Sequence, residues 1–410
     1  APAFCALTEW RLPDGQTQDC GSTAQFTLAP LASRVFTARQ ATGEPVATPA
    51  AAALGLTKAV RRSETSLPAQ WSVRRRDPNW LPLDTCRWRS AGEEWSAPMQ
   101  VLAVHDILTE RGFQGRVTLE FAFEVEVVPG SLFFVCEDAG EKEVAVNHTP
   151  CAYAGLPYLI DPSFLPTDIT ALVRPGRNTV CITTYFTPLK RSSFTLSSLF
   201  ENLTGTELES AYLAGDFVVK SETSSQSAPA GCVRLAPAFV LTEETDAAGS
   251  DLVSAGYPFF AGTILLTQEV QMRKPKPGER VLLTALQPAA CTMAVRCNGH
   301  DLGNRILAPF SWDITGRVLE GRNLLEVTLT NTLRNLLGPH HRPDGEPDNC
   351  WGEGAFKGYG LGAGGNRAEA VMAWAEKGSP DTLAWTSDYM VIPFGPGSLS
   401  VTYFTEAGKP

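Results

Sequence analysis

The feature that most constrains this chain is a phrase of sixteen residues that occurs twice. Residues 168–183 read DITALVRPGRNTVCIT, and residues 313–328 read DITGRVLEGRNLLEVT. Eight of the sixteen positions are identical. An internal repeat indicates that one structural unit is built more than once, so a fold predicted for this chain must contain two copies of that unit.

The second part of each copy has the alternation of a β-strand. Val180 and Ile182 alternate with exposed-type residues in the first copy, and Leu325 and Val327 do so in the second. Successive side chains of a strand point to opposite faces, which gives this period of two. We therefore predict that each copy ends in a half-buried strand.

The first part of each copy resembles a single helical turn. Asp168 and Asp313 stand where an N-cap side chain accepts hydrogen bonds from backbone N–H groups. Gly176 and Gly321 are suited to the left-handed backbone that ends such a turn. The repeated aspartates are thus predicted to be structural, even though their repetition invites a catalytic interpretation.

The parallel between the two halves extends upstream of this phrase. Residues 115–127 (GRVTLEFAFEVEV) parallel residues 262–272 (GTILLTQEVQM), and 144–150 (VAVNHTP) parallel 294–301 (AVRCNGHD). Each half offers several short strands joined by Gly, Pro and Asn turns, without a βαβ series. The predicted fold is all-β, with two tandem antiparallel β-sandwiches of the jelly-roll type and a β-rich N-terminal extension.

A length of 410 residues suits two or three domains. We expect residues 1–75 to be an extension formed by the tail of a preceding domain and a linker, with one strand at 24–31. Residues 76–204 are predicted to form the first sandwich and residues 205–410 the second. The best helix pattern lies at 366–378.

Composition excludes several functional classes. A net charge of −10 argues against nucleic-acid binding, which favours a clustered basic face. No apolar run approaches the length of a membrane span, so we expect a soluble protein without a membrane partner. Ten cysteines occur without CxxC spacing, which favours reduced thiols over zinc ligands and hence the cytoplasm. The chain begins without Met. Either it is a piece of a longer protein, or a signal has been removed, which would make it extracellular.

Several of these segments resemble a known family. Residues 77–88 (DPNWLPLDTCRW) and 93–98 (EEWSAP), followed by the repeated phrase, resemble the galactose-binding-like jelly roll of large glycoside hydrolases. The second half is more similar still, through 255–262 (AGYPFFAG), 308–315 (APFSWDIT) and 321–341 (GRNLLEVTLTNTLRNLLGPHH). These segments resemble the accessory sandwiches behind a family-2-like or rhamnosidase-like catalytic barrel.

The resemblance implies a sandwich fold and a carbohydrate partner, but it carries over no catalytic pair. The strand–helix alternation of a catalytic barrel is missing. We therefore expect a non-catalytic C-terminal accessory region that supports an upstream catalytic domain of the same polypeptide and contacts carbohydrate. Two alternatives stay open, namely a freestanding carbohydrate-binding module and an intact glycosidase that uses the 338–367 loop.

The candidate carbohydrate site combines aromatic platforms with planar polar groups, as sugar recognition requires. The polar loop after the second repeat supplies most of it, and two aromatic residues flank that loop. A structural role, with core aromatics and histidines that bond neighbouring carbonyls, competes with this interpretation. No metal site, structural calcium or cofactor is expected. The candidates are Trp312, His340, His341, Arg342, Asp344, Trp351 and Tyr359.

Overall fold

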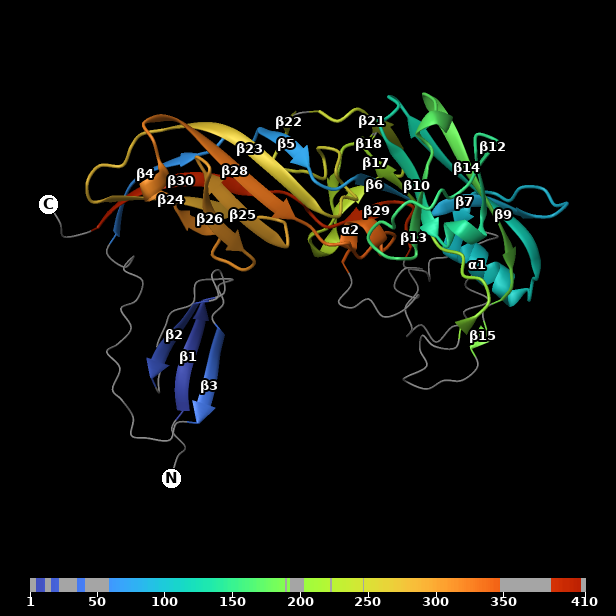
Figure 1. The fold of residues 1–410 in the computed structure, drawn as a ribbon, viewed down its shortest axis with the longest axis horizontal. Coiled ribbons are helices and arrows are strands. Elements are labelled where there is room, and N and C mark those ends of the chain that lie inside the picture. The colour runs from blue at the N-terminus through green and yellow to red at the C-terminus, as the bar shows by residue number, and fades with distance from the viewer. Residues whose placement is uncertain are drawn as a thin grey trace.

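The structure is a computed structural model that describes residues 5–11, 16–21, 35–40, 59–188, 190–191, 203–221, 223–245, 247–346 and 385–406. The predicted fold class is confirmed, since these residues form sheets, antiparallel except for one parallel strand pair, that pack as sandwiches (Figure 1). Within the described ranges two α-helices accompany the strands, α1 (Val101–Glu110) and α2 (Arg334–Leu337). Neither is long and apolar enough to cross a membrane.

The first sandwich is formed by a four-stranded and an eight-stranded sheet. The four-stranded sheet has the order β13 (Phe164–Asp168), β10 (Leu132–Glu137), β17 (Ala211–Gly215), β6 (Asn79–Leu83). The main path of the other sheet is β12 (Thr149–Cys151), β11 (Glu143–Val146), β14 (Gly176–Phe186), β9 (Gly115–Val125), β21 (Phe239–Thr242), β18 (Val218–Ser221). In addition, β7 (Thr85–Ser90) pairs with β9, and β8 (Met99–Gln100) pairs with β7.

The second sandwich is formed by a six-stranded and a four-stranded sheet. The larger sheet has the order β22 (Ala247–Ala248), β5 (Trp71–Arg75), β23 (Thr263–Met272), β28 (Gly321–Thr330), β25 (Thr292–Cys297), β26 (His300–Arg305). The smaller one has the order β27 (Ser311–Asp313), β24 (Glu279–Leu286), β30 (Ser398–Glu406), β4 (Ala59–Ser66). Figure 1 shows the two sandwiches side by side, with one apolar core continuing from the first into the second.

The remaining described strands form three small sheets. β1 (Cys5–Arg11), β2 (Gln16–Gly21) and β3 (Val35–Gln40) form one near the N-terminus. β15 (Lys190–Arg191) pairs with β16 (Leu203–Thr204). The third sheet contains β19 (Gln226–Ser227), β20 (Val233–Leu235) and β29 (Tyr389–Val391).

The repeated aspartates hold turns in the same way in both sandwiches. Asp168 Oδ1 accepts hydrogen bonds from the N–H and the hydroxyl of Thr170, at 2.9 and 2.7 Å. Asp313 Oδ1 accepts the same pair from Thr315. Each aspartate lies one residue before the cap of a short 3₁₀ turn, not at the cap itself. Their role is therefore structural, as the pattern predicted.

The repeated asparagines close each turn onto the following strand. Asn178 Nδ2 donates to the carbonyls of Arg174 and Gly176, at 2.7 and 2.9 Å. Asn323 Nδ2 donates to the carbonyls of Leu319 and Gly321, at 3.0 and 2.9 Å. Both glycines have a positive φ, +89° and +87°, which a residue with a Cβ rarely adopts. The repeated phrase thus forms equivalent structure in the two sandwiches.

Strand pairing differs from the predicted boundaries in two places. β4 and β5, expected in the extension before residue 76, pair with β30 and β23 of the second sandwich. β17, β18 and β21, expected in the second unit after residue 205, pair with strands of the first. Alternation along a strand predicts which face is buried but not which distant strand is its neighbour. Local sequence patterns therefore could not predict that strands expected in one unit pair with strands of another.

The strand predicted at 24–31 and the helix predicted at 366–378 lie outside the described residues. Helix α1 was not predicted, although Val101, Val104 and Leu108 recur at helical spacing and are buried. Its short, Val-rich pattern is also compatible with a strand, which explains the omission.

Candidate functional site

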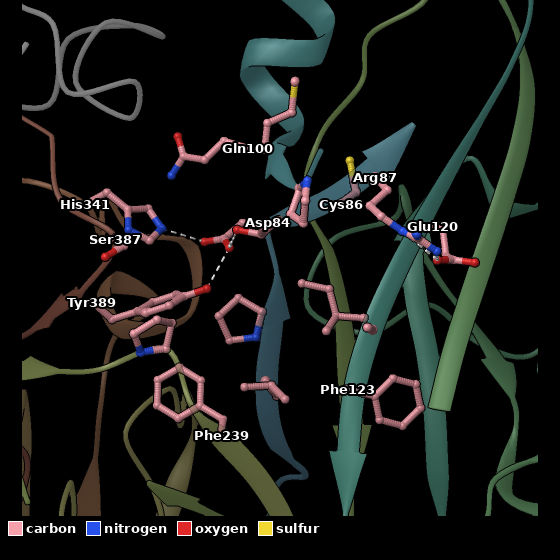
Figure 2. Close-up of a pocket in the computed structure, with 18 of the residues that line it drawn as sticks. Asp84, Cys86, Arg87, Gln100, Glu120, Phe123, Phe239, His341, Ser387 and Tyr389 are labelled. Carbon is pink, nitrogen blue, oxygen red and sulfur yellow. Dashed lines mark hydrogen bonds and ion pairs between the residues drawn. The ribbon is translucent and has the colours of Figure 1, made fainter. Parts of the chain in front are cut away.

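A pocket of about 440 Å³ lies where the first sandwich meets the segment before β29. One wall is the junction of β6 and β7 with β8, a second is the outward face of β9 and β14, and the third is residues 385–389. Pro237 and Phe239, at the start of β21, contribute as well. We call it the Asp84 pocket, after the carboxylate at the centre of Figure 2.

Asp84 is buried and receives hydrogen bonds from two residues distant in the sequence. Its Oδ2 lies 2.9 Å from Nε2 of His341, and its Oδ1 accepts a 2.6 Å hydrogen bond from the hydroxyl of Tyr389. Figure 2 shows both side chains pointing at the carboxylate from the opposite side of the pocket. This Asp84 cluster (Asp84, His341 and Tyr389) ties β6 of the first sandwich to chain that follows the second repeat.

His341 is held as a cation. Its Nδ1 faces the carbonyl oxygens of Thr386 and Asp388, at 3.0 and 3.2 Å, while Nε2 faces the Asp84 carboxylate. Both nitrogens face acceptors, so both carry protons. Burial lowers the pKa of His341, but the charge of Asp84 and the hydrogen bonds outweigh it, and the net pKa is raised. Burial likewise raises the pKa of Asp84, but His341 outweighs it, and the net pKa is lowered.

This arrangement excludes a serine-protease-like relay. Ser387 lines the same pocket, and an Asp–His pair beside a serine invites comparison with a catalytic triad. In a triad, however, one imidazole nitrogen must be free to take the serine proton. Both nitrogens of His341 are already donors, so the Asp84 cluster cannot act as a general base in this state.

The rest of the pocket combines charged, amide and aromatic groups. Arg87 forms an ion pair with the nearly buried Glu120, as Figure 2 shows. Gln100 is 7% exposed, and its side-chain amide forms no hydrogen bond with the described residues. Phe239 and Trp385 provide aromatic surface. The pocket therefore offers the mixture of ring faces and planar polar groups that binds sugars.

The predicted site residues separate in the structure. His341 belongs to the pocket, whereas His340 points into the core, where its Nε2 donates to the Asn335 carbonyl at 2.8 Å. Burial lowers the pKa of His340 to about 4, so it is neutral at pH 7. Both histidines bond neighbouring carbonyls, as the structural interpretation anticipated, and among the described residues no group of metal ligands forms.

The remaining candidates contribute no wall of the Asp84 pocket among the described residues. Trp312 is 1% exposed and donates to the Gly303 carbonyl at 3.0 Å, so it cannot act as a sugar platform. Arg342 is half-buried and Asp344 exposed. Trp351 and Tyr359 lie outside the described residues. Of the candidates within the described residues, only His341 lines the Asp84 pocket.

Sequence reasoning missed most of the pocket. Asp84 lies within residues 77–88, where it interrupts a run of apolar residues. That interruption was the one signal in the sequence that could have indicated a buried carboxylate. Its partners Tyr389 and Trp385 come from a segment that no motif marked. Arg87 and Glu120 carry no signal in the sequence, because only the pairing of β7 with β9 places them opposite each other.

Comparison with known proteins finds no matching family model and no matching curated protein. Parts of solved glycoside hydrolases are similar. The rhamnosidase from Novosphingobium sp. PP1Y is 14% identical over 79% of this chain and 25% of that enzyme, with a TM-score of 0.24. The α-L-rhamnosidase of Streptomyces avermitilis is 14% identical over 65% of this chain and 24% of its own, with a TM-score of 0.23. The β-D-glucuronidase of Dictyoglomus thermophilum is 13% identical over 63% and 42%, with a TM-score of 0.24. This chain spans less than half of each of these enzymes, and similarity of this degree carries no statement about its activity.

Proposed function

We propose that this chain is a non-catalytic accessory region of a glycoside hydrolase, which supports the catalytic domain and binds carbohydrate in the Asp84 pocket. The resemblance of its sequence segments to accessory sandwiches supports the association with such enzymes. The observation that carries the binding proposal is the pocket itself. Its volume of about 440 Å³ lies within the range of small-molecule sites, and its walls carry aromatic rings beside polar groups.

Gln100 is the strongest single indication of a ligand. An amide that lines a pocket without a protein partner is available to a ligand, as donor through its nitrogen and as acceptor through its oxygen. Gln100 is 7% exposed and lines the pocket, its amide atoms are open to the pocket and not sealed in the core, and no described residue bonds them. A sugar hydroxyl, which both donates and accepts, would satisfy such an amide.

The carboxylates of the Asp84 pocket do not suit glycoside hydrolysis. A glycosidase needs one carboxylic acid with a raised pKa beside a second carboxylate. The pKa of Asp84 is lowered instead, since His341 outweighs the effect of burial. Glu120 is engaged by Arg87. Asp84 is therefore not set up to protonate a leaving oxygen at neutral pH.

A second pair of acidic residues lies outside the Asp84 pocket. Glu209 lines another cavity, of about 430 Å³, together with Glu137. Partial burial, followed by the charges of Glu137 and Glu207, raises the pKa of Glu209 to about 8. A hydrogen bond with Glu137 also contributes to this raised pKa, whereas a glycosidase needs its two carboxyl groups on either side of the scissile bond. This pair therefore fits proton sharing better than hydrolysis.

The supporting role rests on polar bonds across the junction of the sandwiches. Arg75, at the end of β5, donates two hydrogen bonds to Glu244, at 2.7 and 2.8 Å. Tyr257 donates to the same carboxylate at 2.7 Å. Asn79, which is fully buried, donates to the carbonyls of Phe217 and Gly256. A junction fixed by paired buried groups is suited to hold a neighbouring domain in one orientation.

A glycan array probed with the purified chain tests this function. We expect binding by the wild-type chain and loss of binding in Gln100→Leu, which removes the amide but keeps most of the volume. Leu333→Ala, an exposed substitution away from the pocket, is the control and should bind normally. Turnover of nitrophenyl glycosides by the chain, or the absence of binding to any glycan, would overturn the proposal.

A further inference from the structure

The two copies of the repeat differ in how they use one arginine. Arg177 and Arg322 are equivalent, since each follows the glycine that begins its strand, β14 or β28. Arg322 forms an ion pair with Glu269 on the neighbouring strand β23. Within the described residues, the guanidinium of Arg177 engages in no hydrogen bond or ion pair.

The strand register explains the difference. In the second sandwich Arg322 lies opposite Gln271, and Glu269 is two residues before Gln271, on the same face of β23. In the first sandwich Arg177 lies opposite Glu124, and the residue two before Glu124 is Ala122. Ala122 therefore occupies the position of Glu269. The first copy therefore has no carboxylate at the position that pairs with the arginine in the second copy.

The substitution also opens the pocket. Ala122 and Arg177 are both among the residues that line the Asp84 pocket. A methyl group at position 122 leaves room on the sheet surface, where the second copy has a glutamate. The neighbouring Arg87–Glu120 pair likewise has no charged counterpart, because the equivalent strand pair of the second sandwich is Ser72 opposite Thr267. The two copies thus differ at several adjacent positions on one face.

The charges of the pocket do not cancel. Asp84 is balanced by His341, and Glu120 is balanced by Arg87. Arg177 remains, so the charged side chains that line the pocket carry one net positive charge. Glu124 lies opposite Arg177 on β9, but it neither lines the pocket nor forms an ion pair with Arg177. On a chain with a net charge of −10, this local surplus is a specific feature.

We propose that the Asp84 pocket takes an anionic sugar and that Arg177 binds its acidic group. A planar guanidinium binds carboxylate and other oxyanions through paired hydrogen bonds, and a carboxylate or a sulfate ester would meet the same donors. The amide of Gln100 and the aromatic rings then recognise the sugar ring. This inference rests on the proposed carbohydrate function and adds the class of ligand.

The test uses acidic oligosaccharides paired with neutral forms of the same molecules. Uronic-acid oligosaccharides are compared with their methyl esters, and sulfated ones with their desulfated forms, by isothermal titration calorimetry. We expect the acidic form to bind at least about tenfold more tightly than the neutral form, since charge-assisted hydrogen bonds are the stronger class. The affinity should fall as salt is raised. Which of the two sets binds identifies the acidic group.

Variants connect the effect to the arginine. Arg177→Gln should lose about tenfold in affinity for the acidic form and nothing for the neutral one, whereas Arg177→Lys should recover part of the loss. Ala122→Glu should supply the missing partner and weaken acidic ligands in the same way. Arg322→Gln, the equivalent change in the second sandwich, is the matched control and should leave binding unchanged.

The outcomes separate the two proposals. If acidic and neutral forms bind equally well, the anionic-sugar inference is wrong, while the carbohydrate function stands. If Arg177→Gln and Arg322→Gln behave alike, Arg177 is not the anion-binding residue and the inference is again overturned. If no oligosaccharide of either set binds the wild-type chain, both proposals fail together.

Discussion

Replacement of Asp84 by alanine should be among the most destabilising single changes in the first sandwich. It leaves the buried, protonated His341 without its counter-charge and the Tyr389 hydroxyl without its acceptor. Unit charges 2.9 Å apart attract by about 6 kcal/mol at an effective dielectric constant of about 20. Desolvation offsets part of this attraction, and removal of one member of a buried pair typically costs about 3–5 kcal/mol. We expect a loss of unfolding free energy in that range.

Asp84→Asn separates charge from shape. Asparagine keeps the volume and an acceptor for Tyr389, so its cost should be smaller, about 1–2 kcal/mol. His341 has a raised folded-state pKa, so its contribution to stability is complete below pH 6.5 and is lost as pH rises through that folded value. Asp84 has a lowered pKa, so its contribution is complete above pH 3.8 and is lost as pH falls through the folded value. The difference between wild type and Asp84→Asn should therefore be largest between about pH 4 and 6.5.

Urea denaturation followed by tryptophan fluorescence, repeated across this pH range, measures both effects. Glu143→Ala is the control, because it removes a carboxylate from an exposed ion pair with Arg116 and should not change the midpoint measurably. A loss below about 1 kcal/mol for Asp84→Ala would refute the buried ion pair. The same would follow if the difference between wild type and Asp84→Asn did not vary with pH.

Three further predictions follow from the structure. His340 has a folded-state pKa of about 4 against an ordinary 6.5, so wild-type stability should fall as pH drops from 6.5 towards 4, and His340→Gln should flatten that fall in the same denaturation series. Asn178→Ala and Asn323→Ala should each cost about 2–3 kcal/mol, because each leaves buried backbone groups unpaired; a marked inequality would argue against equivalent roles. Burial raises the pKa of the Cys86 thiol far above neutrality, so iodoacetamide at pH 7.5 should label the exposed Cys291 and spare Cys86, as peptide mass spectrometry would show.

The sequence was sufficient to predict the fold class because the relevant signals are local. Alternation around Val180 and Leu325 marks buried strands, and the Asp168 and Asp313 turns depend on side chains two residues away. The exchange of strands between the sandwiches could not be predicted in this way. β5, for example, pairs with β23, and the paired residues run from Arg75 with Ile264 to Ser72 with Thr267, far apart in the chain.

The site was harder to predict because its parts meet only in three dimensions. Asp84 and His341 are separated by 257 positions, and Asp84 and Tyr389 by 305. Trp312 had the residue type of a sugar platform, but its position in a strand turns it into the core. What the repeat did provide is a reference copy, since comparison with Arg322 reveals the unpaired state of Arg177 within the described residues.

The most direct test of the central proposal is hydrogen–deuterium exchange of the chain with and without a saturating glycan found on the array. We predict protection of the backbone at residues 98–100 and 385–389, two segments that contribute lining residues to the Asp84 pocket. Protection confined to other segments, such as 218–225 beside a separate cavity, would contradict the assignment of the site. The same conclusion would follow if the glycan protected no segment of the Asp84 pocket.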